Sequence, residues 1–465
     1  MKIKIKNIQQ FTKHKYMRID SKYWETVDKL NYSEKIKLKN LFEIVNGTTQ
    51  TKYYTQEKTE IPYVRIGDMK SKGDVELKNI IYLSDDVQLL KEKLIIEDDL
   101  LIAMIGSTVG KVSTTVNVIG GCCSNNISIL RKKDLTEIQK KYYTLLLQSN
   151  FFYQVFLRIA AQKAQPNLSE YDLAELLLPI IPESKMKEVL KKIEPLQQKI
   201  IQKKSELPSL EEVINSTFEK YFGIERNEYI KIDKIKIKNT SLNDYIKKNE
   251  NLRNSVRFYK AQLIQNYLQS KICCVSLGKY ILNTQNGWSP NCNIESSKFM
   301  VLSLECINSN GKLSLNSEKF SDFKEESTDF LSNNDFLVSR GNTPELVGLA
   351  SVAQISEEME EQIIYPDIMI KVTLSDEINK LYLAYLFNSF IGRYYFKYIS
   401  KGKNISMVKI SKKELNDFLI PKVSKKIQDE IVEVIEKKVK EREKIENDIQ
   451  NLELEISNII VKSIN

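Results

Sequence analysis

One segment of this 465-residue chain has nearly the spacing of a phosphate-binding loop. Gly106-Ser107-Thr108-Val109-Gly110-Lys111-Val112 resembles the loop in which backbone N–H groups and a lysine hold nucleotide phosphates. Its glycines are one residue too close together, and Val112 stands where a serine or threonine would hold magnesium. We therefore expect a turn between two strands here, and not a nucleotide site.

Acids and lysines that could cleave a phosphodiester do not form a recognisable set. Asp172 with Glu183-Ser184-Lys185 faintly resembles a nuclease site, and so does Pro366-Asp367 with Lys371, but neither has the required spacing. The single histidine, His14, leaves no base for Ser-His-Asp or Cys-His catalysis. The Asn-Pro-Pro-aromatic or Asp-Pro-Pro-aromatic motif of amino-methylating enzymes is absent from the sequence. The sequence thus predicts a chain without its own catalytic site.

The six cysteines do not have the spacing of a zinc site, because none forms a C-x-x-C pair. We expect reduced, mostly buried thiols at Cys122, Cys123, Cys273, Cys274, Cys292 and Cys306.

The charge and hydropathy of the chain permit a polyanionic partner. The net charge is +9, from 70 basic and 61 acidic side chains, although a lysine-rich solvated surface gives the same value. The sequence has no apolar run of the ~18 residues that a membrane helix needs, and residues 1–6 are charged with no apolar signal core after them. We expect a cytoplasmic protein that does not contact a membrane.

Side chains of the types that read nucleic acids gather in the loops between predicted strands. Arginine and amides can contact base edges, whereas lysines and hydroxyls position phosphates. The first half of the chain contributes Thr48, Gln50, Lys52, Tyr53, Arg65, Lys70, Lys72, Ser107, Thr108 and Lys111. The second half contributes Gln285, Asn286, Trp288, Ser289, Asn291, Arg340, Asn342, Thr343, Lys401, Lys403 and Asn404. The two sets occupy equivalent places but differ in identity, which predicts two modules reading two different short sequences.

The elements that carry these loops occur twice, about 240 residues apart. Each copy has short β-rich runs separated by turn residues, followed by a helix. We expect strands at 38–45, 62–66, 100–105 and 127–130 with a helix at 139–161, then strands at 299–304, 336–338 and 368–372 with a helix at 379–399. The repeated motifs are 63–66 with 301–304, 99–102 with 335–338, 147–149 with 387–389, 167–169 with 404–406, and 178–179 with 420–421.

Each copy runs into a charged rod of roughly 40 residues, about 60 Å long if helical. Apolar residues three and four apart form a coiled-coil seam in each rod. The seams are Val189, Ile193, Leu196, Ile200, Leu207, Leu210, Ile214 and Tyr221, and Ile431, Val434, Val439, Ile445, Ile449, Leu452, Ile456 and Ile459. Pro195 and Pro208 are predicted to kink or break the first rod.

Neither seam can stay exposed to water, so each rod needs a partner. Antiparallel pairing of the two rods within one chain is the simplest solution; self-association and docking on another subunit are the alternatives. Antiparallel pairing would place the two modules at opposite ends of a dumbbell related by a pseudo-twofold axis.

In both halves, these motifs resemble the specificity (S) subunit of a type I restriction-modification system. The resemblance rests on residues 61–65, 99–102 with Gly106 and Gly110-Lys111, 335–343, 165–169 and 404–406. The usual Glu-Gln pair after the proline is Glu183-Ser184 here and Ile427-Gln428 in the second copy, which leaves the partner methyltransferase open. Residues 18–24 also resemble recognition chains of related type II systems.

The resemblance implies an α/β (α+β) fold with two similar mixed α/β target recognition domains separated by two long antiparallel coiled-coil helices. The expected domains are 1–183, an N-terminal segment with target recognition domain 1; 184–222, helical spacer 1; 223–252, a linker; 253–423, target recognition domain 2; and 424–465, helical spacer 2.

The same resemblance implies a non-catalytic DNA specificity subunit. Each recognition domain would read one half of a bipartite double-stranded DNA site, and the spacers would set the gap and dock two methyltransferase subunits. Those subunits, and not this chain, would bind S-adenosylmethionine; motor-nuclease restriction subunits are optional further partners. The assembled complex would be a DNA adenine methyltransferase and endonuclease for phage defence. Alternatives are a type II recognition subunit, a protein-binding coiled-coil scaffold and a self-contained nuclease or modification enzyme.

Overall fold

The computed structural model of the chain has two compact units. Unit 1 comprises Met1–Lys204 with Asn447–Asn465, and unit 2 comprises Ser205–Glu446. The structure describes residues 26, 30, 32–55, 57–70, 73–78, 80–160, 166–236, 255–292, 297–315, 318–321, 330–402 and 407–464. The predictions for His14, residues 18–24, Lys72, Gln165, Lys403 and residues 404–406 lie outside this description. Among the described residues, no helix combines the length and apolarity of a membrane span.

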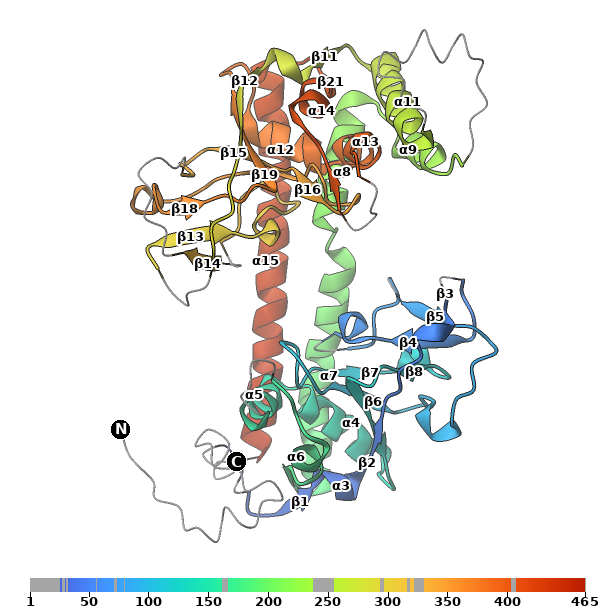
Figure 1. The fold of residues 1–465 in the computed structure, drawn as a ribbon. Coiled ribbons are helices and arrows are strands. Elements are labelled where there is room, and N and C mark those ends of the chain that lie inside the picture. Colours follow the sequence, from blue (N-terminus) through green and yellow to red (C-terminus); the bar gives the residue numbers. More distant parts are fainter. Residues whose placement is uncertain are drawn as a thin grey trace. The chain divides into compact units, whose positions relative to one another are not determined.

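Unit 1 contains two four-stranded sheets followed by helices (Figure 1). The first sheet is antiparallel, in the order β2 (Phe42–Asn46), β9 (Ile127–Lys132), β6 (Leu100–Ala103) and β7 (Val112–Thr114). The second has the order β3 (Tyr54–Thr55), β5 (Ile81–Leu83), β4 (Ile61–Val64) and β8 (Cys122–Cys123), with β4 and β8 parallel. The remaining elements are β1 (Lys35–Lys37), which pairs with β10 (Leu177–Pro179), and α3 (Leu38–Leu41), α4 (Glu137–Leu147), α5 (Asn150–Ile159) and α6 (Glu170–Ala174).

Unit 2 repeats this topology. Its antiparallel sheet has the order β12 (Ile281–Asn286), β19 (Met369–Leu374), β15 (Phe336–Ser339) and β17 (Ala350–Val352). A second sheet joins β14 (Glu318–Ser321), β13 (Phe299–Leu302) and β18 (Ile363–Ile364), and β13 and β18 are parallel. The other elements are β11 (Cys274–Ser276) with β21 (Leu419–Pro421), β16 (Gly341–Asn342) with β20 (Val408–Lys409), and helices α8 (Leu210–Phe222), α9 (Arg226–Asp233), α11 (Val256–Lys271), α12 (Lys380–Asn388), α13 (Phe390–Ile399) and α14 (Lys412–Asn416).

The duplication extends to individual ion pairs. Asp99, just before β6, lies 2.9 Å from Arg131 of β9, and its counterpart Asp335 lies 3.6 Å from Lys371 of β19. Burial raises the pKa of Asp99, and the bond from Arg131 opposes that rise. The paired residues therefore fix the same two strands in both units, which confirms the repeat read from residues 99–102 and 335–338.

One helix was expected in each copy after the last strand, and this prediction is wrong, because each unit has two. The breaks fall at Ser149 and Ser389, whose hydroxyls accept from the backbone N–H of Phe152 (3.2 Å) and Ile391 (3.3 Å). Each serine thus starts a new helix by capping its free N–H groups. The strand expected from Leu38 is also shorter, because residues 38–41 form α3 before β2 begins.

The motif match between residues 167–169 and 404–406 is also wrong. Asn167 bridges to Ile105, whereas the matching bridge in unit 2 joins Lys409 to Gly341. Ser169 caps α6, and Ser411 forms the capping box of α14. Residues 409–411 are therefore the structural counterpart of 167–169.

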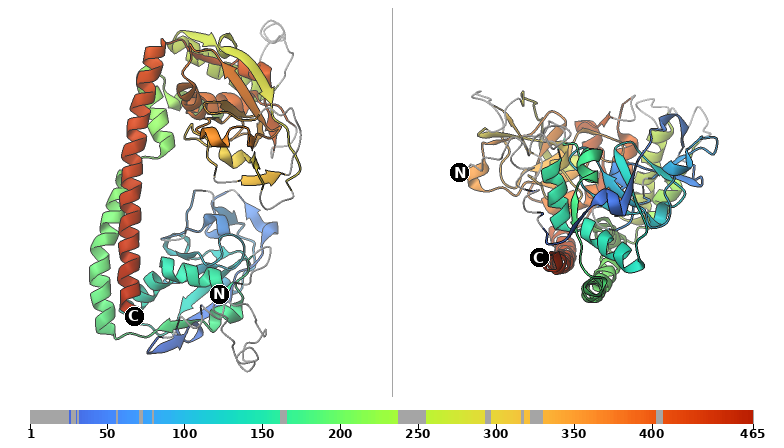
Figure 2. Two further views of the ribbon diagram at one scale, coloured as in Figure 1. Left: turned by 90° about the vertical axis from the view of Figure 1, so that its left-hand side faces the viewer. Right: turned by 90° about the horizontal axis from the view of Figure 1, so that it is seen from below.

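The first rod is interrupted, whereas the second is a single helix (Figure 2). Helix α7 (Glu183–Glu206) ends before Pro208, and α8 follows it, so this proline breaks the rod as predicted. Pro195 is tolerated inside α7. Helix α15 (Lys425–Ile464) runs without interruption.

Each unit contains an antiparallel pair of rod segments. In unit 1, Lys203 of α7 lies 2.8 Å from Asp448 of α15, and Met186 near the start of α7 shares a core with Ile460 near the end of α15. In unit 2, Arg442 of α15 donates to the carbonyl of Pro208 at 2.6 Å. The pairing predicted within one chain is thus present in each unit. The dumbbell arrangement and the domain boundaries stay predictions.

Of the sixteen expected seam residues, seven are buried, eight are partly buried and Tyr221 is exposed. Ile431 is buried, yet its expected neighbour Val434 is only partly covered and Ile435 is fully buried instead. Tyr221 is 37% exposed, whereas Phe218 and Phe222 are buried. The apolar side chains of α8 and of the start of α15 therefore pack into the main core of unit 2.

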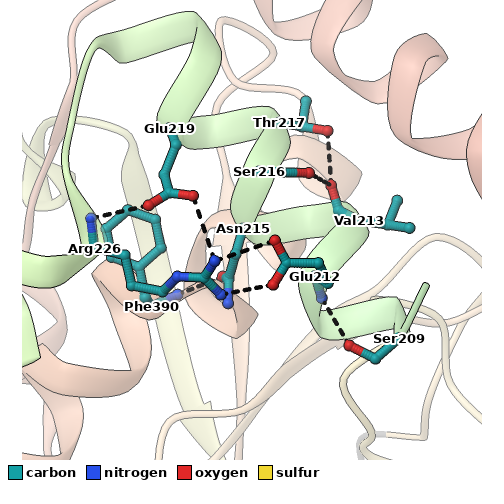
Figure 3. Close-up of polar contacts among 9 residues, drawn as sticks. All are labelled: Ser209, Glu212, Val213, Asn215, Ser216, Thr217, Glu219, Arg226 and Phe390. Carbon is teal, nitrogen blue, oxygen red and sulfur yellow. Dashed lines mark hydrogen bonds and ion pairs between the residues drawn. The ribbon is translucent and has the colours of Figure 1, made fainter.

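Helix α8 is joined to the rest of unit 2 by one buried hydrogen bond and by ion pairs nearer the surface (Figure 3). The Asn215 side chain, 1% exposed, accepts from the backbone N–H of Phe390 at 2.8 Å and so caps α13. Arg226 at the start of α9 donates to both carboxylate oxygens of Glu212 and lies 3.6 Å from Glu219. These bonds fix where α13 begins relative to α8.

Candidate nucleic-acid interface

In unit 2, four loop segments meet at one end of the sheet that contains β12 and β15. Asp367 is the centre of this meeting point: its carboxylate accepts from the Ser289 hydroxyl at 2.7 Å, and its carbonyl accepts from Arg340 Nη1 at 3.1 Å. The backbone N–H of Ile410 donates to the carbonyl of Arg340 at 2.9 Å. The loops that contain Ser289, Arg340 and Asp367, and the segment leading into Ile410, therefore form one cluster.

The loop after β12 is held close to the segment before β19. Gly287 N–H donates to the Met369 carbonyl at 3.2 Å, and Trp288 N–H donates to the Tyr365 carbonyl at 3.1 Å. A Cβ on Gly287 would lie 2.0 Å from the Tyr365 carbonyl oxygen, so this close approach requires glycine. Asn286, Ser289 and Asn291 are exposed on this loop.

Lys401 joins the same cluster through Lys409. The two residues bridge in antiparallel fashion, and Lys409 in turn pairs with Gly341 beside Asn342. The Lys401 ammonium lies 2.6 Å from Glu414. Burial would raise the pKa of Glu414, but bonds from Lys401 and Ser411 outweigh it and the pKa is lowered. Part of the positive charge of Lys401 is thus already neutralised by a buried carboxylate.

In unit 1, the corresponding loops meet around Thr48. Its N–H donates to the Cys123 carbonyl at 2.8 Å, and its carbonyl accepts from the Tyr63 hydroxyl at 2.9 Å. Gln50 donates to the Thr48 hydroxyl at 3.2 Å. Gly47 N–H donates to the Ile127 carbonyl, as Gly287 does to Met369 in unit 2. The two loop clusters are therefore built on the same backbone contacts.

The segment with Ser107, Thr108 and Lys111 is the turn between β6 and β7, as expected. Lys111 N–H donates to the Thr108 carbonyl at 3.1 Å, and Gly110 N–H donates to Ala103 at 2.8 Å. The turn lies at the sheet end where β6 pairs with Ile127 at the start of β9. Ser107, Thr108 and Lys111 thus lie at the same end of the sheet as Thr48.

Two other predicted residues of unit 1, Arg65 and Lys70, are placed differently. Arg65 forms two 3.1 Å bonds to the carboxylate of Asp68, which is 4% exposed, so much of its guanidinium is used inside the domain. The Lys70 carbonyl accepts from Ser113 of β7, and its ammonium is 3.6 Å from Glu76. Lys70 therefore lies beside β7 rather than at the loop end.

Lys52 and Tyr53 lie on a 3-10 turn, Thr51–Tyr53, that leads into β3. Tyr53 N–H donates to the Gln50 carbonyl at 3.0 Å, which ties this turn to the loop that carries Thr48. Lys52 is exposed and Tyr53 is partly buried. Lys52 and Tyr53 therefore border the loop cluster of unit 1 at the second sheet.

Three side chains that support the loops were missed in the sequence. Gln148 donates to the carbonyl of Val112, the first residue of β7, at 3.3 Å. Its counterpart Asn388 bonds both backbone groups of Ala350, the first residue of β17, at 2.9 and 2.8 Å. Arg393 of α13 holds the turn before β17. The repeated motif at 147–149 and 387–389 was a signal for the two amides, but nothing in the spacing indicated Arg393.

One acid from each nuclease-like group makes a local structural contact. Asp172 accepts from the Ser169 hydroxyl at 2.7 Å in the first turn of α6, and Asp367 belongs to the loop cluster of unit 2. Among the described residues, no group of three or more His, Cys, Asp or Glu could hold a metal ion. Cys122, Cys123 and Cys306 are buried, Cys274 and Cys292 are partly buried, and Cys273 is exposed. Burial raises the pKa of the Cys122 thiol to about 12.

Comparison with known families gives one match. Residues 32–212 match the family model described as "Type I restriction modification DNA specificity domain". The match covers the two sheets of unit 1, helices α4 to α7 and the start of α8. No curated protein sequence matches the chain.

Three solved structures are similar to this chain over most of its length. One, from a study of complex assembly and conformational transition of a type I system, has a TM-score of 0.41 and 15% identity, covering 93% of this chain and 97% of that one. The S subunit from M. genitalium has a TM-score of 0.37 and 15% identity, covering 94% and 97%. The HsdS subunit from Thermoanaerobacter tengcongensis has a TM-score of 0.31 and 14% identity, covering 93% and 96%.

The family match shows that residues 32–212 are similar to a DNA specificity domain. This similarity confirms the family resemblance and the specificity-subunit function read from the sequence. Most of unit 2 lies outside the matched residues, but it repeats the sheet order and the parallel strand pair of unit 1. The chain therefore contains two domains of the same architecture.

Proposed function

We propose that this chain reads a bipartite double-stranded DNA site, one half with the loop cluster of each unit. The observation that carries the proposal is the repetition of one backbone framework with different side chains on it. Thr48 and Gln50 occupy the loop after β2, where unit 2 has Trp288 and Ser289 after β12. The same loop positions with different donors and acceptors would contact different bases.

The chain would select the DNA without modifying it. Its partners would be two methyltransferase subunits, which hold S-adenosylmethionine and methylate adenine, and a restriction subunit could join them to cut unmodified DNA. The paired segments of α7 and α15 and of α8 and α15 would act as spacers between the half-sites and as docking surfaces. This assignment is supported by the family match and by the dispersal of Asp172 and Asp367 to structural contacts.

Selection from a randomised DNA library tests this proposal. The purified chain, together with its methyltransferase subunit, should enrich duplexes that carry two short fixed sequences separated by a gap of constant length and free sequence. Enrichment of a single uninterrupted motif would contradict a reading of two half-sites by two units. Failure to enrich any motif would favour a protein-binding scaffold.

A further inference from the structure

The turn that leads into the edge strand of the antiparallel sheet is longer in unit 2 than in unit 1. It spans residues 104–111 between β6 and β7, and residues 340–349 between β15 and β17, which is two residues more. The longer turn carries the candidate DNA-binding residues Arg340, Asn342 and Thr343. A longer turn loses more conformational entropy when it is fixed, so the placement of these side chains depends on what holds it.

Arg393 holds the middle of this longer turn. Its Nη2 donates to the carbonyl of Glu345 at 3.1 Å and also to the carbonyl of Val347. The two ends of the turn are held by other groups, because Asn388 bonds Ala350 and Ile410 N–H bonds the Arg340 carbonyl.

Among the residues that the structure describes, the shorter turn of unit 1 has the same supports except this one. Gln148 bonds Val112 as Asn388 bonds Ala350. The aromatic ring beneath the turn is also shared: a Cβ on Gly110 or on Gly348 would lie within 2.5 Å of Phe156 or Phe396, respectively. Counted from the capping serines Ser149 and Ser389, the residue that corresponds to Arg393 is Tyr153. The turn of unit 2, which is two residues longer, therefore also has the additional polar contacts from Arg393.

Packing alone does not explain an arginine at this position. Its Nε and Nη1 are buried and have no hydrogen-bond partner among the residues that the structure describes. They lie at a cavity of about 820 Å³ whose wall includes Asn342, Asn308 and Glu345. An unpaired buried donor lowers the stability of the fold, because it loses its hydrogen bonds to water without replacement. Apolar residues of similar volume often replace buried charged groups without loss of stability.

The helix that carries Arg393 is itself fixed at its start. Asn215 of α8 accepts from the backbone N–H of Phe390, as Figure 3 shows, and the Ser389 hydroxyl accepts from Ile391 N–H. The Arg393 side chain therefore extends from a fixed position, one turn after the capped start of α13. From there its guanidinium bonds the carbonyls of Glu345 and Val347.

We propose that Arg393 is a positioning residue for sequence discrimination by unit 2. It holds two carbonyls of the turn, so that Asn342 and Thr343 approach the bases in one geometry. Without this anchor the turn still forms, but its side chains accept more than one base. This inference rests on the proposed function, in which unit 2 reads one half-site.

The test measures methylation by the complex of the chain with its methyltransferase subunit. The substrates are duplexes with the selected two-part site and with single base changes in either half. R393M should lower discrimination about 10-fold in one half-site only, the size expected for a lost base contact. R393K should keep part of the discrimination, because one ammonium can still bond a carbonyl. The matched control Y153M in unit 1 should leave both half-sites unchanged.

Thermal unfolding separates positioning from folding. R393M should unfold at the wild-type Tm or above, because it removes two unpaired buried donors. If the wild type reads a two-part site and R393M discriminates between bases as well as the wild type does, the inference is overturned. The proposed function is then unaffected. A lower Tm with loss in both half-sites would assign Arg393 a purely structural role. Absence of any two-part site for the wild type would overturn the proposed function and this inference with it.

Discussion

Glu436 of α15 lies 2.6 Å from the ammonium of Lys312, and the same carboxylate accepts from the hydroxyl of Tyr385. Lys312 follows Gly311 in the loop beside β17, and Tyr385 is in α12. The counterpart of Glu436 in unit 1, counted from the start of the rod helix, is Glu194, which is exposed. One carboxylate of the rod helix therefore holds a loop and a helix of unit 2 together.

Removing this charge should destabilise unit 2. E436Q leaves the Lys312 ammonium without its counter-ion and weakens the bond from Tyr385. Because both charged groups are partly exposed, we expect a loss of about 1–2 kcal/mol. That corresponds to a Tm lower by about 2–8 °C in a unit of this size. The transition of unit 2 can be followed by calorimetry. The matched control E194Q should leave the Tm unchanged; an equal effect of both substitutions would contradict a specific role for Glu436.

The contribution of Glu436 should also depend on pH. Burial alone would raise its pKa, but the bonds from Lys312 and Tyr385 and the charge of Lys312 lower it below the usual 4.5. A carboxyl with a depressed pKa stabilises the fold above its unfolded pKa, and this contribution disappears as the pH falls through the folded value. The difference in unfolding free energy between wild type and E436Q should therefore be constant from pH 7 to about pH 5 and shrink below about pH 4.5. A difference that shrinks already near pH 6 would point to another group.

The turn glycines give a third prediction. Gly348 has φ +76°, and a Cβ there would lie 2.4 Å from Cγ of the Phe396 ring. G348A should cost about 1–3 kcal/mol through backbone strain, and more through the clash with the ring. Chemical denaturation measures this loss of stability, with G67A as the control variant. In G67A the new methyl meets nothing within 4 Å, so it should leave stability within about 1 kcal/mol of the wild type. Equal stability of the two variants would show that Phe396 moves aside without cost.

Strand patterns and turn residues predicted most of the framework, because they depend on neighbours in the sequence. Asp99–Ile102 and Asp335–Val338 could be recognised as equivalent strands from their order alone. The helix breaks at Ser149 and Ser389 could not be recognised in this way. The helical spacing of apolar residues continues past Ser149 to Phe152, and a serine cap affects only the backbone next to it. The match of residues 167–169 to 404–406 failed because a short motif occurs by chance near its structural counterpart.

The candidate site was predicted in part. Loop residues such as Thr48 and Ser289 could be selected because amides and hydroxyls between strands are a local feature. The ion pair between Arg65 and Asp68 could also have been predicted, because the two residues are three apart in the sequence. The contact of Arg393 with a turn some 46 residues earlier depends on how α13 packs, which no local pattern reveals.

A fourth prediction concerns the spacers. Ile200 of α7 is 7% exposed, and Lys203 nearby pairs with Asp448, so α7 and α15 are in register here. A four-residue helical insertion after Ile200, matched by four residues after Ile449 in α15, adds ~6 Å to the pair. The gap between half-sites should then widen by about 2 base pairs, at ~3.4 Å each. Selection of DNA from a library with variable gaps measures this; an unchanged gap would show that this segment does not set the spacing. An insertion in α7 alone should instead lower stability, because it moves Lys203 away from Asp448.

The central claim is that each unit reads its own half of a two-part DNA site. Long-read sequencing of methylated DNA from a host that expresses the chain with its methyltransferase subunit tests it most directly, with N342A as the informative variant and N451A, on an exposed position of α15, as the control. We predict a methylated two-part motif that is lost when the chain is deleted. N342A should relax one half only, and N451A should leave both intact. Methylation that is unchanged by deletion of the chain, or equal relaxation of both halves in N342A, would contradict the account.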